Sequence, residues 1–217
     1  PTGKDIWART HTNIHVYCLA TDKNCNVYYA YSNVVFKLDR NSNELWSDAS
    51  VINPQDIVTL NGYVYIAYAT QKGAKTIRKL RDNGTSFTEI WSKTDADSAH
   101  SIDVDDWGNV YCGHQSNEMT IRKLNPYGGV LWTTKNSRGY IPKALVVDGG
   151  GNVYWGGEYA PLVKTHHEGV ELSVASNYGA QIYQLALDSE GILYVPHKLE
   201  SGKTLQKIDG KHYYTLT

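Results

Sequence analysis

A sequence repeat of about forty residues occurs five times along this chain. Each copy has a polar turn, then Asn-Val-Tyr or a close relative, then a strand that carries a lysine. The anchor tyrosines are Tyr28, Tyr65, Tyr111, Tyr154 and Tyr194, and the anchor lysines are Lys37, Lys79, Lys123, Lys164 and Lys207. A repeat of this period with several strands per unit is typical of propeller blades, which bury their apolar faces only by packing on one another. The repeat therefore constrains the fold strongly, whereas a shared scaffold does not identify a ligand.

Each copy contains four short segments rich in Val, Ile, Tyr and Thr, separated by clusters of Gly, Asn and Asp, which is the pattern of strands and hairpins. No window of a dozen residues keeps the apolar period of a helix. The sequence predicts an all-β fold, a five-bladed β-propeller of four-stranded antiparallel blades, in a single domain spanning 1–217. The predicted blades are 13–50, 54–95, 98–136, 141–176 and 181–217.

The segment DIWART, residues 5–10, matches the fourth strand of a blade, because Trp7 lies 39 residues before Trp46. A closed ring of sheets needs its first and last sheets sealed together. We therefore expect residues 5–10 to pair with the last sheet and close the ring. The C-terminal KHYYTLT also matches a fourth strand, so which terminal strand closes the ring stays open, as does the possibility that the chain is part of a longer protein.

Recurring and buried side chains have a packing role in this interpretation. Trp46, Trp91 and Trp132 occupy one position of the repeat and are predicted to pack between neighbouring blades. Cys18 and Cys112 lie within strand patterns and are predicted to be buried thiols. Three cysteines without a CxxC spacing argue against a disulfide framework and a zinc site of that type.

Composition argues against several classes of partner. The 21 basic and 22 acidic side chains give a net charge of −1, so nothing favours nucleic acid or an anionic membrane. The longest apolar runs are only strand-length, and the N-terminal residues lack the apolar core of a secretory signal, so we expect no membrane span and synthesis in the cytoplasm. There is no P-loop, nucleophile elbow or dinucleotide fingerprint, and no cofactor is predicted. The oligomeric state is not indicated.

The third copy carries the clearest family likeness, in DDWGNVYCGH and RKLNPYGGVLWTT. It resembles bacterial β-propeller repeat families of the SBBP and NHL-like kinds, which carry a D-x-x-G-N-V-Y turn and a K-L-x-x-x-G-x-x-x-W stretch. The likeness spans all five copies and is weakest in the second, and KLDRNSNELW is also similar to quinoprotein-type propeller repeats, without their catalytic acidic residues. The resemblance implies a propeller, and propellers that look like this include binding modules, lyases and virion components.

The resemblance also implies where a ligand binds. In such propellers the ligand-facing side is built by the loops that enter each innermost strand and the loops that join second and third strands. The candidate ligand-binding residues in those loops are His15, Asp56, His100, His114, Lys143, Glu158, Tyr183 and His197. Such a face can bind a metal, supply a general acid or base, or consist only of polar loop residues. Because no paired ligand spacing recurs from copy to copy, neither a metal ligand nor a catalytic residue is assigned.

Two further motifs suggest metal binding less strongly. His166 and His167 are adjacent, and since neighbouring residues of a strand point to opposite faces, we do not expect them to chelate together. The acidic stretch between Asp103 and Asn109 has calcium-like spacing, but the same Asp and Gly recur in other copies as turn residues. A turn is the simpler interpretation.

These observations favour a non-enzymatic binding module that presents loops on one propeller face to a protein or glycan. A phage virion or receptor-binding component is a specific version of this hypothesis. The alternative is a small propeller enzyme, a lyase or hydrolase, with His and Glu residues at the central axis. Convergence of His15, His100, Glu158 and His197 in a pocket would favour the enzyme, and their dispersal on a flat rim would favour the binding module.

Overall fold

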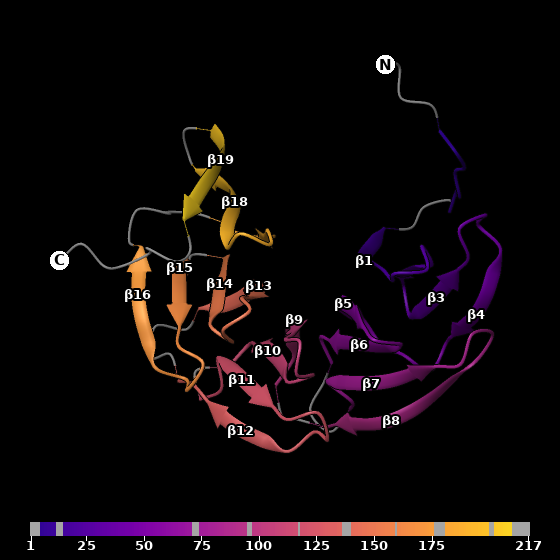
Figure 1. Ribbon diagram of the computed structural model, residues 1–217, viewed down its shortest axis with the longest axis horizontal. Coiled ribbons are helices and arrows are strands. Elements are labelled where there is room, and N and C mark those ends of the chain that lie inside the picture. Colours follow the sequence, from indigo (N-terminus) through magenta and orange to yellow (C-terminus); the bar gives the residue numbers. More distant parts are fainter. Residues whose placement is uncertain are drawn as a thin grey trace.

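The computed structural model describes residues 5–11, 15–70, 74–94, 97–116, 118–135, 140–158, 160–175, 181–199 and 202–209. Within 173–175, 197–199 and 202–204 only the backbone is described. These residues form antiparallel sheets around a common centre (Figure 1). In the described ranges, no helix has the length and apolar character needed to cross a membrane.

The described residues form five sheets, which follow one another along the chain. The first contains β1 (Val16–Thr21), β2 (Val27–Tyr31), β3 (Val34–Leu38) and β4 (Glu44–Asp48). The second contains β5 (Pro54–Leu60), β6 (Tyr63–Tyr68), β7 (Ile77–Asp82) and β8 (Phe87–Lys93). The third contains β9 (Ala99–Val104), β10 (Val110–His114), β11 (Ile121–Leu124) and β12 (Val130–Thr133). The fourth contains β13 (Ile141–Val147), β14 (Val153–Glu158), β15 (Ala160–Thr165) and β16 (Glu171–Ala175), and the last contains β17 (Ala186–Leu187), β18 (Ile192–Leu199) and β19 (Gly202–Asp209).

In the four-stranded sheets the chain starts near the centre and ends at the rim, so that β1, β5, β9 and β13 lie innermost (Figure 1). The sheets form an arc that is open between the first sheet and the last one (Figure 1). The prediction of an all-β fold built from repeated antiparallel sheets is confirmed. Closure into a five-bladed ring is not confirmed, and the predicted fourth strand of the last copy falls on residues outside the described ranges.

The recurring aspartate builds the turn between the first two strands of a sheet. Asp105 Oδ1 accepts the backbone amides of Trp107 at 3.1 Å and Asn109 at 2.8 Å. Its Oδ2 accepts the Asn109 side-chain amide at 2.8 Å and the Tyr111 hydroxyl at 3.0 Å. The same pattern recurs at Asp22, Asp148 and, without the Asn, at Asp188. This carboxylate is satisfied by four protein donors, which confirms a turn rather than a calcium loop.

The backbone of these turns requires a left-handed residue. Gly108, Gly151 and Gly191 have φ near +80°, and Cys25 takes that position in the first copy with φ 61°. In the second sheet Asn61 and Gly62 both have positive φ, as a type I′ hairpin requires.

A lysine and a tryptophan of one sheet donate to the outer hairpin of the next. Lys79 Nζ and Trp91 Nε1 each lie 3.0 Å from the carbonyl oxygen of Pro126. In the same way, Lys123 and Trp132 donate to the carbonyl oxygen of His167. Lys37 and Trp46 donate to the carboxylate of Asp82. The predicted packing of these tryptophans between neighbouring sheets is therefore confirmed.

Residues 5–11 lie against the first sheet without forming a strand. Trp7 Nε1 donates to the carbonyl oxygen of Arg40 at 3.1 Å, and Arg9 pairs with Glu44 at 3.2 Å. Arg40 belongs to the β3–β4 hairpin, so Trp7 makes the contact that the outer strand of a preceding sheet would make. The predicted pairing of residues 5–10 with the last sheet is not confirmed.

Apolar clusters fill the spaces between neighbouring sheets. Cys18 belongs to the cluster between the first and second sheets, and Cys112 to the one between the second and third. Both are buried, as predicted, whereas Cys25 is exposed. Burial raises the pKa of Cys18 to about 12, so this thiol is a packing residue rather than a nucleophile.

Candidate functional site

The innermost strands share a β-bulge near their first residues. Pairing with the neighbouring strand skips Tyr17 in β1, Gln55 in β5, His100 in β9 and Lys143 in β13. Tyr183 holds the same position before β17, since it precedes Asp188 by five residues, as His100 precedes Asp105. A bulge re-aims a side chain out of the normal alternation and is common next to binding sites. These five bulge-position residues are different in every copy except for the two tyrosines.

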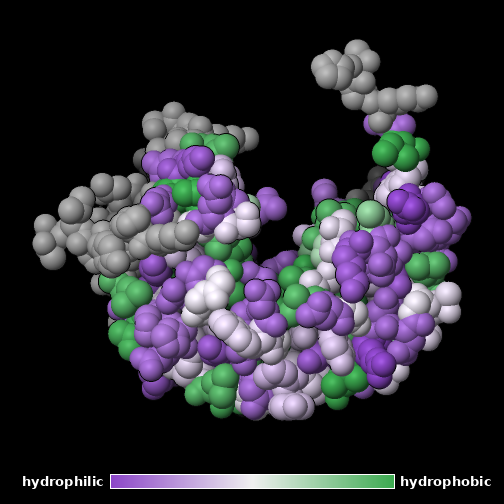
Figure 2. Space-filling view, viewed as in Figure 1, coloured by the Kyte–Doolittle hydropathy of each residue, from purple (hydrophilic) through white to green (hydrophobic). Residues whose placement is uncertain are grey.

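All five bulge-position residues line one cavity of about 490 Å³ near the centre of the arc. Its walls include Ile57, Ile102 and Leu145, and it also contacts Asp56 and Asp103. The volume lies within the usual range of small-molecule sites. Figure 2 shows the molecule hollowed between the two ends of the arc, with hydrophilic and hydrophobic residues at the border. We call the cavity lined by the five bulge-position residues the axial cavity.

His100 is the centre of a hydrogen-bonded cluster that joins three sheets. Its Nδ1 lies 3.1 Å from Lys143 Nζ and 3.4 Å from Gln55 Oε1, and its Nε2 lies 3.0 Å from Gln115 Oε1. An ammonium only donates and an amide oxygen only accepts, so Nδ1 accepts from Lys143 and Nε2 donates to Gln115. With this tautomer the more distant Gln55 Oε1 is a polar neighbour of Nδ1 and not its hydrogen-bond acceptor. Burial lowers the pKa of His100, and the Lys143 charge lowers it further, against the Gln115 bond. The ring is therefore neutral at pH 7.

Among the residues that the structure describes, Lys143 is the one cation that lines the axial cavity. Its side chain is half-buried, and burial lowers its pKa, while the negative charge of Glu158 opposes that shift. Glu158 ends β14, and its backbone forms a bridge with Gln181. A positive group next to a neutral imidazole and two amide side chains favours a ligand rich in hydrogen-bond acceptors.

The carboxylates of Asp56 and Asp103 accept hydrogen bonds from backbone amides, although both residues line the cavity. Asp56 accepts the amides of Ile57 and, on the next sheet, Ile102, both at 2.9 Å. Asp103 likewise accepts the amides of Val104 and, on the following sheet, Val147, both at 2.8 Å. Burial raises the pKa of Asp56 to about 7 and that of Asp103 to about 6. These two carboxylates tie successive innermost strands together, so Asp56, a sequence candidate for the site, has a structural role.

We expect Asp56 and Asp103 to titrate near pH 7 and pH 6. Their pKa values in the folded state lie above the unfolded value of 3.8, so the folded protein holds protons that the unfolded chain has released. Their contribution to stability is fully present below pH 3.8 and is lost as the pH rises through 6 and 7. Carboxyl ¹³C NMR measures both midpoints. Asp188, whose pKa is lowered by the amides of Ile192 and Glu190, is the control and should titrate below 3.8. Midpoints near 4 for the first two would contradict the prediction.

Some of the residues proposed from the sequence line the axial cavity and others do not. His100, Lys143 and Tyr183 line the axial cavity, with Asp56 in its wall. His15 is exposed just before β1 and does not line it. His114 was expected in a loop but ends β10 and is buried, with Nδ1 donating to the Asp97 carbonyl at 3.3 Å. His197 was also expected in a loop but lies in β18, and its side chain is outside the described part of the chain.

Sequence reasoning missed Tyr17, Gln55 and Gln115. The first has a readable signal, since Tyr17 precedes its turn aspartate, Asp22, by five residues, as do His100 and Lys143 in their copies. The second copy has an Asn-Gly turn in place of that aspartate, so Gln55 has no such reference point.

A second hollow of about 710 Å³ lies beyond the other end of the innermost strands. Its acidic lining includes Asp105, Asp148 and Asp188, whose carboxylates are occupied by the turns described above. These three carboxylates are therefore already engaged within the protein.

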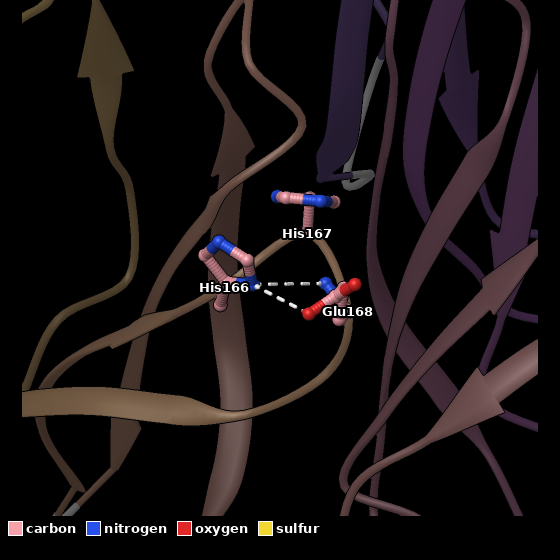
Figure 3. A group of neighbouring side chains, drawn as sticks. All are labelled: His166, His167 and Glu168. Carbon is pink, nitrogen blue, oxygen red and sulfur yellow. Dashed lines mark hydrogen bonds and ion pairs between the residues drawn. The ribbon is translucent and has the colours of Figure 1, made fainter.

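One further cluster stands apart from both hollows, in the β15–β16 hairpin (Figure 3). His166, His167 and Glu168 each offer an atom suited to a metal, and these atoms lie within 4.8 Å of one another. The expectation that the two histidines face apart was wrong, because they lie in a turn rather than a strand and their ring centroids are 3.9 Å apart.

Neither a family model nor a curated protein matches this chain. Solved structures do match it. A Bacteroides caccae protein of unknown function has a TM-score of 0.69 at 20% identity, covering 95% of this chain and 82% of its own. A streptogramin B lyase has a TM-score of 0.68 at 14% identity over 89% of this chain and 68% of that one. A chain of the nidogen–laminin complex has a TM-score of 0.66 at 13% identity over 90% and 76%. The chain has a β-propeller repeat fold.

At these identities the likeness shows the fold alone. It supports a repeat of the propeller kind, as predicted, but it does not support the narrower SBBP or NHL-like assignment or a virion role. The similar structures include both a lyase and a chain from a protein–protein complex, so they do not choose between an enzyme and a binding module.

Proposed function

We propose that this protein is a non-catalytic binding module whose axial cavity takes a saccharide. The observation that carries the proposal is the convergence of the five bulge-position residues on one cavity. The scaffold residues recur from copy to copy, whereas this position varies, so it is where the repeat is free to acquire a specific task.

The chemistry of the cavity fits a sugar. Tyr17 and Tyr183 line the cavity and are 50% and 54% exposed, and partly exposed aromatic rings at a cavity are suited to stacking on a pyranose face. Gln55 lines the cavity and offers its amide to hydroxyl groups, and Lys143 favours a carboxylate or another acceptor on the ring. The volume of about 490 Å³ suits one or two sugar units rather than a protein loop.

The arrangement of His100 favours binding over catalysis. A general base needs a nitrogen lone pair within reach of a substrate proton. In His100 the Nδ1 lone pair accepts from Lys143, and Nε2 donates to Gln115. The proposed role of the imidazole is therefore to hold Lys143 in place at the cavity, while the bond to Gln115 fixes the orientation of the ring.

The test is a glycan array that includes neutral and uronic-acid sugars, followed by calorimetry with the best ligand. Lys143→Ala and Tyr183→Ala are each expected to weaken binding at least tenfold, as expected when a hydrogen-bonded charge or a stacking ring is removed. His15→Ala is the matched control, because His15 is exposed but does not line the cavity. Absence of glycan binding, or equal affinity in both cavity variants, would refute the proposal.

A lyase is the second candidate, because His100 and Lys143 lie 3.1 Å apart in a cavity and the similar structures include virginiamycin B lyase of Staphylococcus aureus. Another of them is an H270A form of that lyase, described as catalytically inactive and solved with quinupristin. Incubation of our protein with quinupristin decides this candidate. We expect no turnover, and turnover that His100→Ala abolishes would establish the enzyme instead.

A further inference from the structure

We propose that the β15–β16 hairpin binds one late first-row divalent cation of the Zn²⁺ class through His166, His167 and Glu168 (Figure 3). We refer to these three residues as the HHE turn. The proposal is independent of the axial cavity, from which the HHE turn is separate.

The ligand atoms already lie near metal-binding positions. His166 Nδ1 is 3.6 Å from Glu168 Oε2, and the two point toward one another in Figure 3. Ligands about 2.1 Å from a tetrahedral Zn²⁺ are separated by roughly 3.4 Å. The complete set lies within 4.8 Å, and the His167 side chain is exposed, so it has room to rotate toward the other two ligands.

The backbone beneath these side chains is held firmly. The carbonyl oxygen of His167 accepts Trp132 Nε1 at 2.7 Å and Lys123 Nζ at 3.4 Å, both from the preceding sheet. Gly169 has φ +89° and packs on the Trp132 ring, where an added Cβ would be 3.0 Å away. Because the turn is fixed before any ion arrives, chelation orders side chains alone, which favours affinity.

The turn itself does not explain His166. The equivalent hairpins begin with Asp39 or Asn125, whose Oδ1 accepts the amides two and four residues later at 2.8–3.0 Å. His166 Nδ1 instead lies 3.4 Å from the amide of Glu168. A histidine is therefore a weaker turn former here than the residues of the other copies, whereas it is the better metal ligand.

Two imidazoles and one carboxylate select the ion class. This set of ligands suits zinc and other late first-row divalent ions rather than the all-oxygen sites preferred by Ca²⁺ or Mg²⁺. With three protein ligands, a fourth position is open to water or to a group on a partner.

The experiment is calorimetric titration of the full chain with ZnCl₂, with CoCl₂ absorption as a second readout of tetrahedral geometry. We expect one ion per chain. His167→Ala and His166→Ala should each weaken binding at least tenfold, and Glu168→Gln by a smaller factor. His15→Ala, which removes an exposed histidine elsewhere, should leave affinity unchanged.

Circular dichroism melting in the absence of metal should show that His167→Ala and Glu168→Gln are as stable as the original protein, because both side chains are exposed. Lack of zinc binding at submillimolar concentration would overturn the proposal, as would equal affinity of the His167→Ala variant. Sugar binding by the axial cavity should not change on adding Zn²⁺, so the two proposals fail separately.

Discussion

Gly157→Ala is expected to disrupt the fourth sheet rather than merely weaken it. A Cβ at Gly157 would lie 1.7 Å from the carbonyl oxygen of Ile141 and 3.0 Å from the amide nitrogen of Lys143. Both are backbone atoms, so no side-chain rotation relieves the clash. Gly157 pairs with Pro142 beside the bulge at Lys143, and the close approach is part of the bulge geometry.

The expected cost of Gly157→Ala is about 4 kcal/mol or more, at the upper end for single substitutions, and it would also displace Lys143 from the axial cavity. Urea unfolding followed by circular dichroism measures it. Gly149→Ala is the matched control, since an added Cβ there meets nothing within 4 Å. Equal unfolding midpoints for the two variants would show that the strand relaxes around the new methyl group.

Much of the fold could be predicted from the sequence because its contacts are local or repeated. Asp105 binds amides two and four residues later, so the turn depends only on nearby residues. The lysine–tryptophan contact, as in Lys79 and Trp91, recurs once per repeat and therefore appears as a period in the sequence. Such features are fixed within one unit or between identical neighbours.

The rest depends on geometry that no single copy contains. The rotation between successive sheets follows from the volumes packed between them, so ring closure could not be derived from the period alone. The bulges at Gln55 and Lys143 were also hidden, because strands covered on both faces lack the alternation that reveals register. For the same reason His114, at the end of a covered strand, was taken for a loop residue although it is buried.

Asp82→Asn is expected to cost about 3 to 5 kcal/mol, the range for removing one member of a buried ion pair. Asp82 Oδ2 lies 2.6 Å from Lys37 Nζ, and the two side chains are 11% and 2% exposed. The same carboxylate accepts Trp46 Nε1 at 3.0 Å and the Tyr28 hydroxyl at 3.1 Å. Asparagine keeps an acceptor oxygen but carries no charge, so the Lys37 ammonium is left between the first and second sheets with neutral acceptors such as the carbonyl of Gly84 at 2.9 Å.

A double-mutant cycle separates the contribution of the Lys37–Asp82 ion pair from that of the other hydrogen bonds of Asp82. In a Lys37→Met background no buried cation remains to be neutralised, so Asp82→Asn should cost much less than it does alone. Glu118→Gln is the surface control, because Glu118 and Lys135 form an ion pair with 76% and 72% exposure, and its loss should stay within about 1 kcal/mol. Urea midpoints of the four proteins of the cycle give the coupling energy. A cost of Asp82→Asn that is the same with Lys37 and with Met would mean that the hydrogen bonds to Trp46 and Tyr28, rather than the ion pair, join the first two sheets.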